Sequence, residues 1–137
     1  MKTFKILYIL VFINLIQANL NAQWINIFQG NNVTFHAIDC LSDDTVFVAG
    51  TQSTVLRTYD KGQTWQAINP IFEIDAVDIN FPDELTGYIV GYNGKIAKTT
   101  NCGNNWELMV TDTSYTLIEA LFINADSGWI IGSHLYE

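Results

Sequence analysis

The chain has 137 residues, of which 49% are hydrophobic and 15% charged, so it holds enough apolar material for one packed domain. The formal net charge is −8, and removing residues 1–22 leaves four cations against all 14 carboxylates. So acidic a surface repels phosphate groups, and no basic cluster offsets it. This balance argues against nucleic acid and anionic membrane as partners.

The N-terminal segment has the order of a secretory signal peptide. Two lysines lie in the first five positions, an almost wholly apolar run covers residues 6–16, and a short polar exit ends at Ala22. The run is shorter than the roughly 20 residues that cross a bilayer, and no cysteine follows it to carry a lipid. We therefore expect residues 1–22 to be a signal peptide. The protein would be exported to the periplasm, cell surface or exterior, with no stable membrane anchor.

A short polar turn occurs twice, at residues 58–65 and, 41 residues later, at 99–106. In such a turn a Thr ends one strand, an Asp or Asn oxygen accepts backbone N–H bonds, and a Gly takes the positive φ. A Trp then opens the next strand and fills an apolar gap between repeats. We expect a structural role, not a catalytic or metal-binding one, for these residues: Thr58, Asp60, Gly62, Trp65, Thr99, Asn101, Gly103 and Trp106.

The spacing of 41 residues extends through the rest of the chain, and a fixed period in this range indicates a repeat architecture. Three columns of residues show it: Trp24, Trp65 and Trp106; Gly50, Gly91 and Gly132; and Phe47, Tyr88 and Trp129. Cys40 falls in a column with Phe81 and Phe122, so we expect it to be a small core residue. Cys102 lies in the second turn, and a bridge between the two cysteines is not expected.

Each repeat is rich in β-branched and aromatic residues and predicts four short strands, with no helical stripe. In the second repeat these strands are expected at 74–80, 86–92, 95–100 and 105–110. Four strands in about 40 residues is typical of a β-propeller blade. The sequence therefore predicts an all-β fold built from antiparallel four-stranded blades.

The repeats predict an incomplete ring, because propellers close with about four to eight blades. We expect about two full blades plus parts of two others within residues 23–137. The expected parts are a lone outer strand at 24–28, a blade at 33–69, a blade at 74–110 and an incomplete blade at 117–137. The missing blades would come from a longer chain or from self-association, and the isolated piece would behave poorly as a monomer.

The pattern Thr-x-Asp-x-Gly-x-x-Trp at 58–65 resembles the Asp-box of the bacterial neuraminidase repeat. A second pattern is more specific to one family. It is Phe81-x-x-x-x-x-Gly87-Tyr88-Ile89-Val90-Gly91, and it occurs again at 122–132. It resembles the photosystem II stability/assembly-factor-like propellers, whose relatives include many secreted bacterial proteins. The resemblance covers roughly residues 24–137, and it implies that the box closes the hairpin between the third and fourth strands. Asn101 for Asp and Val46 for Gly depart from the pattern.

Propellers usually bind ligands on the loops between blades and between the second and third strands of a blade. Here these are residues 29–34, 70–75 and 111–116, with turns at 52–53, 93–94 and 134. Candidate binding residues near the channel mouth are Asp75, Asp78, Glu119, His36 and Asp39. The first three would form an acidic patch, or else a solvated rim of an acidic protein.

We expect a binding or structural module for protein or glycan recognition, with no cofactor, no metal and no catalysis of its own. The alternative is the N-terminal fragment of an Asp-box glycoside hydrolase, with Asp78 and Glu119 as its paired carboxylates. Family sialidases hold the substrate with three arginines. This chain has only Arg57, which we expect to be an exposed strand residue.

Overall fold

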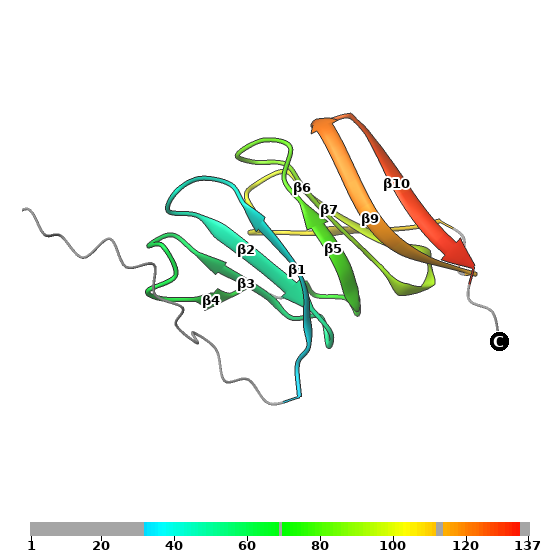
Figure 1. Ribbon diagram of the computed structural model, residues 1–137, viewed down its shortest axis with the longest axis horizontal. Coiled ribbons are helices and arrows are strands. Elements are labelled where there is room, and N and C mark those ends of the chain that lie inside the picture. The colour runs from blue at the N-terminus through cyan, green and yellow to red at the C-terminus, as the bar shows by residue number, and fades with distance from the viewer. Residues whose placement is uncertain (1–31, 69, 112–113, 135–137) are drawn as a thin grey trace, which may run out of the picture.

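The computed structural model describes residues 32–68, 70–111 and 114–134. The signal peptide expected at 1–22 and the outer strand expected at 24–28 lie outside these residues. Within the described part every element is a strand, apart from the three-residue 3-10 helix η1 (Tyr92–Gly94). The prediction of an all-β fold is confirmed (Figure 1).

Two four-stranded antiparallel sheets follow one another along the chain, each in simple up-and-down order. The first sheet contains β1 (Phe35–Cys40), β2 (Val46–Gly50), β3 (Val55–Thr58) and β4 (Gln66–Ala67). The second contains β5 (Ala76–Asn80), β6 (Gly87–Gly91), β7 (Lys95–Thr99) and β8 (Glu107–Val110). Most strands of the two sheets start 41 residues apart, as the repeat predicts.

The third sheet has two described strands, β9 (Tyr115–Asn124) and β10 (Ser127–His134). Both are longer than any strand of the first two sheets. They pair along almost their whole length, with register shifts at both ends of the segment from Gly128 to Ile131.

The sheets stack face to face, with their first strands β1, β5 and β9 side by side (Figure 1). The aromatic residues of β2 and β6 stack on a Phe at or near the end of the first strand in the next repeat. Phe47 lies 4.1 Å from Phe81, and Tyr88 lies 3.6 Å from Phe122, between ring centroids. These stacks are part of the two apolar clusters that join the first sheet to the second and the second to the third.

Polar side chains on the first strands bind the backbone of the next repeat. The Phe81 N–H donates to Asp39 Oδ2 at 2.6 Å, and the Phe122 N–H donates to Asn80 Oδ1 at 2.9 Å. The residues at these two junctions are 41 positions apart. Each bond satisfies a backbone N–H that faces out of its own sheet. It therefore fixes the position of that first strand relative to the first strand of the neighbouring sheet.

Cys40 is exposed, so the expectation that it is a core residue is wrong. Its counterpart Phe81 is buried because the first sheet covers it. Cys40 lies on the face of the first sheet that points away from the second sheet. No described residue covers that face as Phe47 covers Phe81.

Candidate binding site

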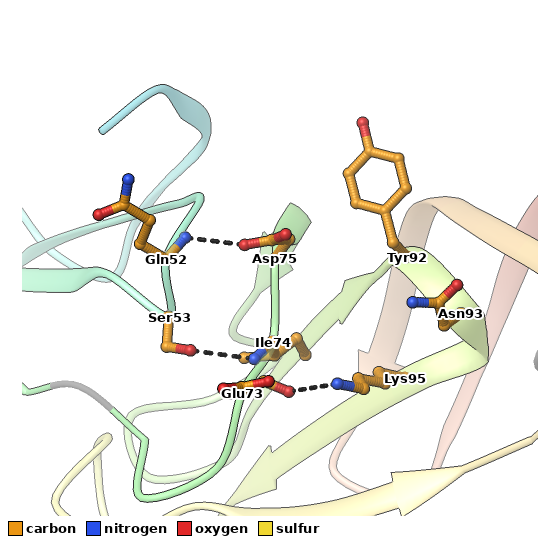
Figure 2. Close-up of a pocket in the computed structure, with 8 residues that line it drawn as sticks. All are labelled: Gln52, Ser53, Glu73, Ile74, Asp75, Tyr92, Asn93 and Lys95. Atoms are coloured by element: carbon orange, nitrogen blue, oxygen red, sulfur yellow. Dashed lines mark hydrogen bonds between the residues drawn. The ribbon is translucent and has the colours of Figure 1, made fainter. Parts of the chain in front are cut away.

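Three loops from two neighbouring repeats enclose a pocket of about 470 Å³ (Figure 2). They are the β2–β3 turn of the first sheet, the β6–β7 turn of the second, and the segment that connects the two sheets. The lining residues are Gln52, Ser53, Glu73, Ile74, Asp75, Tyr92, Asn93 and Lys95. Ligand binding is expected on these same classes of loop in a propeller, and the structure brings three of them together.

The two turns have unusual backbone conformations that short polar residues tolerate. Gln52 and Ser53 have φ of 57° and 55°, and Asn93 and Gly94 have φ of 59° and 65°. Asn and Gly adopt this left-handed region readily, whereas Gln and Ser do so less often. Hydrogen bonds to the neighbouring segment hold the strained first turn in place.

The connecting segment is bonded to both turns. Asp75 Oδ1 accepts the Gln52 N–H at 2.7 Å, and Ser53 Oγ accepts the Ile74 N–H at 3.0 Å. On the other side, Lys95 Nζ donates to the backbone oxygen of Glu73 at 2.7 Å. Ile74 is fully buried and anchors the segment in the apolar cluster. The pocket is therefore a preformed feature of the junction between two sheets.

Of the five candidate residues, Asp75 is the one that lines this pocket. The carboxylates of Asp39 and Asp78 bind the next strand instead, Asp78 Oδ2 accepting the Ala120 N–H at 2.8 Å. His36 and Glu119 are exposed on β1 and β9. The structure thus gives Asp39 and Asp78 a role in joining the sheets.

Tyr92 and Lys95 line the pocket, although they were not among the candidate residues. The available signal was their position beside the Asn93-Gly94 turn, which was expected to be a ligand-binding loop. Glu73 lies in the expected loop at 70–75 but was not singled out.

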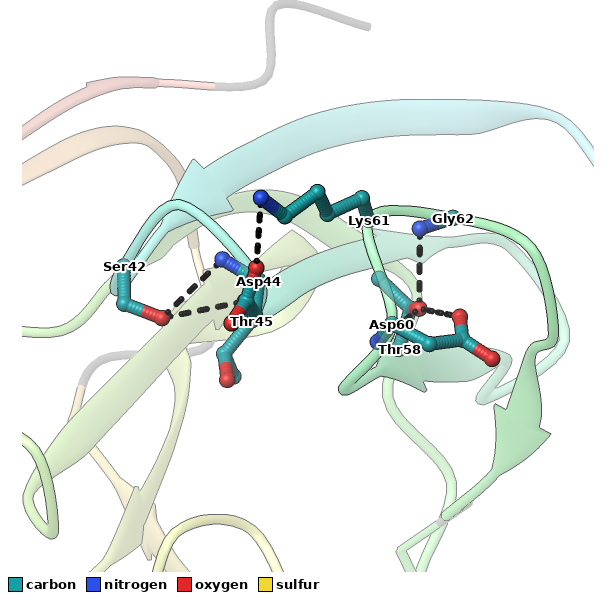
Figure 3. A network of polar contacts seen from close by, with 7 residues as sticks. All are labelled: Ser42, Asp44, Thr45, Thr58, Asp60, Lys61 and Gly62. Carbon is teal, nitrogen blue, oxygen red and sulfur yellow. Dashed lines mark hydrogen bonds and ion pairs between the residues drawn. The ribbon is translucent and has the colours of Figure 1, made fainter.

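The first polar turn, at 58–65, is held by its own side chains (Figure 3). Thr58 Oγ1 accepts the Gly62 N–H at 3.0 Å, and Asp60 accepts from both the backbone N–H and the hydroxyl of Thr64, at 2.8 and 2.6 Å. The hydrogen bonds from Thr64 and Thr58 lower the pKa of Asp60 to about 2. Lys61 pairs with Asp44 at 3.1 Å and ties the turn to the β1–β2 hairpin.

The second turn, at 99–106, repeats most of these bonds with Asn101 in place of Asp. Thr99 Oγ1 accepts the Gly103 N–H at 3.0 Å, and Asn101 Oδ1 accepts the Asn105 N–H at 2.8 Å. Trp106 is buried and meets the Phe81 ring edge-on at 6.1 Å, whereas Trp65 is half-buried beside its own Gly62. The two indoles differ in burial because the cluster around Trp106 includes residues of the first sheet, and no described sheet lies beyond Trp65.

Arg57 is only 5% exposed, so the expectation of an exposed strand residue is wrong. Its guanidinium extends from β3 to the second turn, where Nη1 donates to the Cys102 carbonyl at 2.5 Å and to Asn104 Oδ1 at 3.1 Å. It also donates to Gln66 Oε1 on β4 at 3.2 Å. Arg57 therefore links the first sheet to the second and is not available to a ligand.

A smaller hollow of about 210 Å³ lies next to this link and is lined by Leu41, Ser42, Thr45, Tyr59, Glu84 and Cys102. Tyr59 OH lies 3.8 Å from Cys102 Sγ. Burial, followed by the contact with Cys102, raises the pKa of Tyr59.

Over the three described ranges, no cluster of His, Cys, Asp and Glu could hold a metal ion. Nor does any helix there have the length and apolar character needed to span a membrane.

Stacked four-stranded antiparallel sheets, repeated at a fixed period with a loop pocket at their junction, define a β-propeller architecture. The structure of YCF48 from Cyanidioschyzon merolae is similar, with a TM-score of 0.65 at 13% identity over 77% of this chain and 37% of that chain. A structure described as YCF48 bound to D1 peptide has a TM-score of 0.56 at 16% identity, covering 72% of this chain and 40% of that one. Both likenesses show the fold.

The family described as photosynthesis system II assembly factor YCF48 matches residues 65–135, more than half of the chain, and the chain belongs to this family. The resemblance read from the sequence is confirmed. No curated protein matches the chain. The part of the chain that aligns spans less than half the length of either similar structure.

Proposed function

We propose that this chain is a propeller segment that binds a protein ligand, as an extended peptide, in the pocket between the first and second sheets. The observation that carries the proposal is the pocket itself, about 470 Å³ in volume and built from three loops that hydrogen bonds hold together. Binding sites are usually concave and largely formed before the ligand arrives. One similar structure is described as bound to a peptide, which supports a peptide as the ligand class.

The proposed module has no catalysis of its own. A glycoside hydrolase needs two carboxylates that face one bound sugar. Asp78 is one of the two carboxylates considered for that role, and its Oδ2 accepts the backbone N–H of Ala120. Neither Asp78 nor Glu119 lines the pocket. Binding is therefore the function that these side chains favour.

The proposal includes export, because residues 1–22 have the order of a signal peptide. Expression of the full chain in a bacterium with a secretion pathway, followed by N-terminal sequencing of the product, tests this point. A product that begins near Gln23 and lies outside the cytoplasm is expected. A product retained in the cytoplasm with Met1 intact would contradict it.

The proposal also includes further sheets that complete the ring, from a longer chain or from a second copy. The third sheet exposes large apolar side chains: Ile118, Leu121, Ile123, Trp129 and Ile131. A contiguous exposed patch of this kind usually marks an interface. Trp129 occupies the repeat position at which Phe47 and Tyr88 stack on the next sheet.

Selection of a displayed random-peptide library on the purified chain tests the binding proposal. Selected peptides should lose affinity when Tyr92 is replaced by Ala, because Tyr92 borders the pocket and is 39% exposed. Leu85→Ala is the control, since Leu85 is an exposed apolar side chain on the β5–β6 hairpin, at the other end of the sheet. Peptides indifferent to Tyr92→Ala, or binding of glycans in place of peptides, would contradict the proposal.

A further inference from the structure

We infer that the pocket between the first and second sheets selects a positively charged side chain, Lys or Arg, on the peptide that it binds. This inference rests on the proposed function and adds the chemical class of the ligand. It follows from the arrangement of charges and of one aromatic ring around the pocket.

Two acidic residues, Glu73 and Asp75, line the pocket, and both are exposed. Asp75 uses Oδ1 to accept the Gln52 N–H, which fixes the orientation of the carboxylate. Its second oxygen remains to accept a bond from a ligand, because a carboxylate has about four acceptor positions. Glu73 lies two residues away on the same connecting segment.

Lys95 is the single cation among the lining residues, and it is already engaged. Its ammonium donates to the backbone oxygen of Glu73 at 2.7 Å, and Figure 2 shows the side chain extending towards that residue. The lining therefore carries two negative charges and one positive charge, on a chain whose formal net charge is −8. A cationic group meets a favourable potential here, and an anionic group meets an unfavourable one.

Tyr92 supplies a second attraction for a cation. Its ring extends outward at the rim, across the opening from Gln52 (Figure 2), and is 39% exposed. The face of a tyrosine ring attracts Lys and Arg side chains through its quadrupole. A guanidinium or ammonium lying between this ring and the carboxylate of Asp75 would satisfy both.

Of the remaining lining residues, Ile74 is apolar and fully buried, and three are neutral and polar: Gln52, Ser53 and Asn93. They provide acceptors for the other N–H groups of a guanidinium. An apolar side chain would leave these groups and both carboxylates without a partner from the ligand, so the lining does not favour it.

The test uses two peptides that differ only in charge. Acetyl-Gly-Gly-Arg-Gly-Gly-amide is titrated into the 15N-labelled full chain, in parallel with the peptide that carries citrulline, the neutral analogue of arginine. The arginine peptide should shift the amide signals of Gln52, Asp75 and Asn93 and bind about threefold more tightly than the citrulline peptide. That preference should weaken as salt is added.

Variants assign the preference to the pocket. Asp75→Asn keeps an oxygen for the Gln52 N–H, and Glu73→Gln leaves the backbone oxygen that binds Lys95, so both preserve the local structure. Each should weaken binding of the arginine peptide about twofold and leave binding of the citrulline peptide unchanged. Asp43→Asn is the control, because it removes a carboxylate charge on the β1–β2 hairpin, at the other end of the sheet. It should change the affinity for neither peptide.

The outcomes separate this inference from the proposed function. Pocket amides that shift with equal affinity for both peptides would overturn the charge preference and leave the pocket as a peptide site. A preference for arginine that is undiminished in both pocket variants would overturn the assignment to Asp75 and Glu73. Pocket amides that stay unmoved by either peptide at millimolar concentration would overturn the inference and the proposed site together.

Discussion

The phenyl ring of Phe81 fills the space that a side chain at Gly87 would occupy. A Cβ atom at Gly87 would meet three atoms of that ring, with Cδ1 2.7 Å away. Gly128 and Phe122 repeat this relationship in the third sheet. In the first sheet the corresponding pair is Cys40 and Val46, which lie opposite each other on β1 and β2. The departure at Val46 therefore has a structural partner: a small residue on β1 leaves room for a larger one on β2.

Replacing Gly87 by Ala should destabilise the protein by about 1–3 kcal/mol, the usual cost of overpacking a core. The ring cannot move aside easily, because Phe81 is buried and stacked on Phe47. Urea unfolding followed by tryptophan fluorescence measures the change. The double variant Phe81→Cys/Gly87→Val, which copies the pair of the first sheet, should be more stable than the sum of its single variants predicts. Additive effects would contradict this account of the pair.

Arg57→Lys should lower the free energy of unfolding by about 1–3 kcal/mol although it keeps the charge. The guanidinium binds Cys102, Asn104 and Gln66 at once, and a single ammonium cannot reproduce that fork. Lys61→Arg, at an exposed position, is the control and should change stability little. An unaffected Arg57→Lys variant would show that the link between the sheets contributes nothing measurable.

Asp60 should make stability depend on pH in acid. Hydrogen bonds lower its pKa from 3.8 to about 2 in the folded chain, so its contribution is fully present above the unfolded pKa. That contribution is lost as the pH falls from about 4 through about 2. Asp60→Asn should be less stable than the natural chain near neutral pH, and the difference should shrink in acid. Denaturant unfolding midpoints of both proteins, measured from neutral pH to about pH 2, check this. A difference in stability that stays constant with pH would refute the role given to Asp60.

Asp39→Ala should destabilise the chain by about 1–3 kcal/mol, because the Phe81 N–H would lose its acceptor at the junction of the first two sheets. Asp43→Ala, an exposed carboxylate in the next turn, should have an effect below about 0.5 kcal/mol. Thermal unfolding of the two variants distinguishes them. If Asp39→Ala instead leaves stability intact and abolishes ligand binding, Asp39 belongs to the binding site after all.

Trp129→Ser should reduce self-association without loss of stability, because the indole is 65% exposed on the third sheet. Tyr88→Ala should cost about 3 kcal/mol or more, since Tyr88 is 4% exposed and stacks on Phe122. Sedimentation velocity at several concentrations measures the association, and unfolding measures the stability. A compact monomer at all concentrations, with or without Trp129, would contradict an interface on this face.

Local patterns in the sequence were enough to predict the strands, the turns and the period. Turn residues such as Thr58, Asp60 and Gly62 bond to their own segment, so their roles follow from a few neighbouring positions. The loops that form the pocket were predicted in another way: propellers usually bind ligands on the loops between blades and between the second and third strands, and the repeat gives their positions.

The tertiary structure decided which polar residues join the sheets and which face a ligand. Asp39, Arg57 and Asp75 are all charged residues in or beside strands, yet the first two bind the next repeat and only the third lines the pocket. Cys40 and Phe81 share a repeat position but differ in burial, because only Phe81 is covered by a preceding described sheet. A repeat in sequence fixes the contacts within each sheet. The contacts between sheets depend on how the sheets stack, and therefore on which residues of a neighbouring sheet lie opposite.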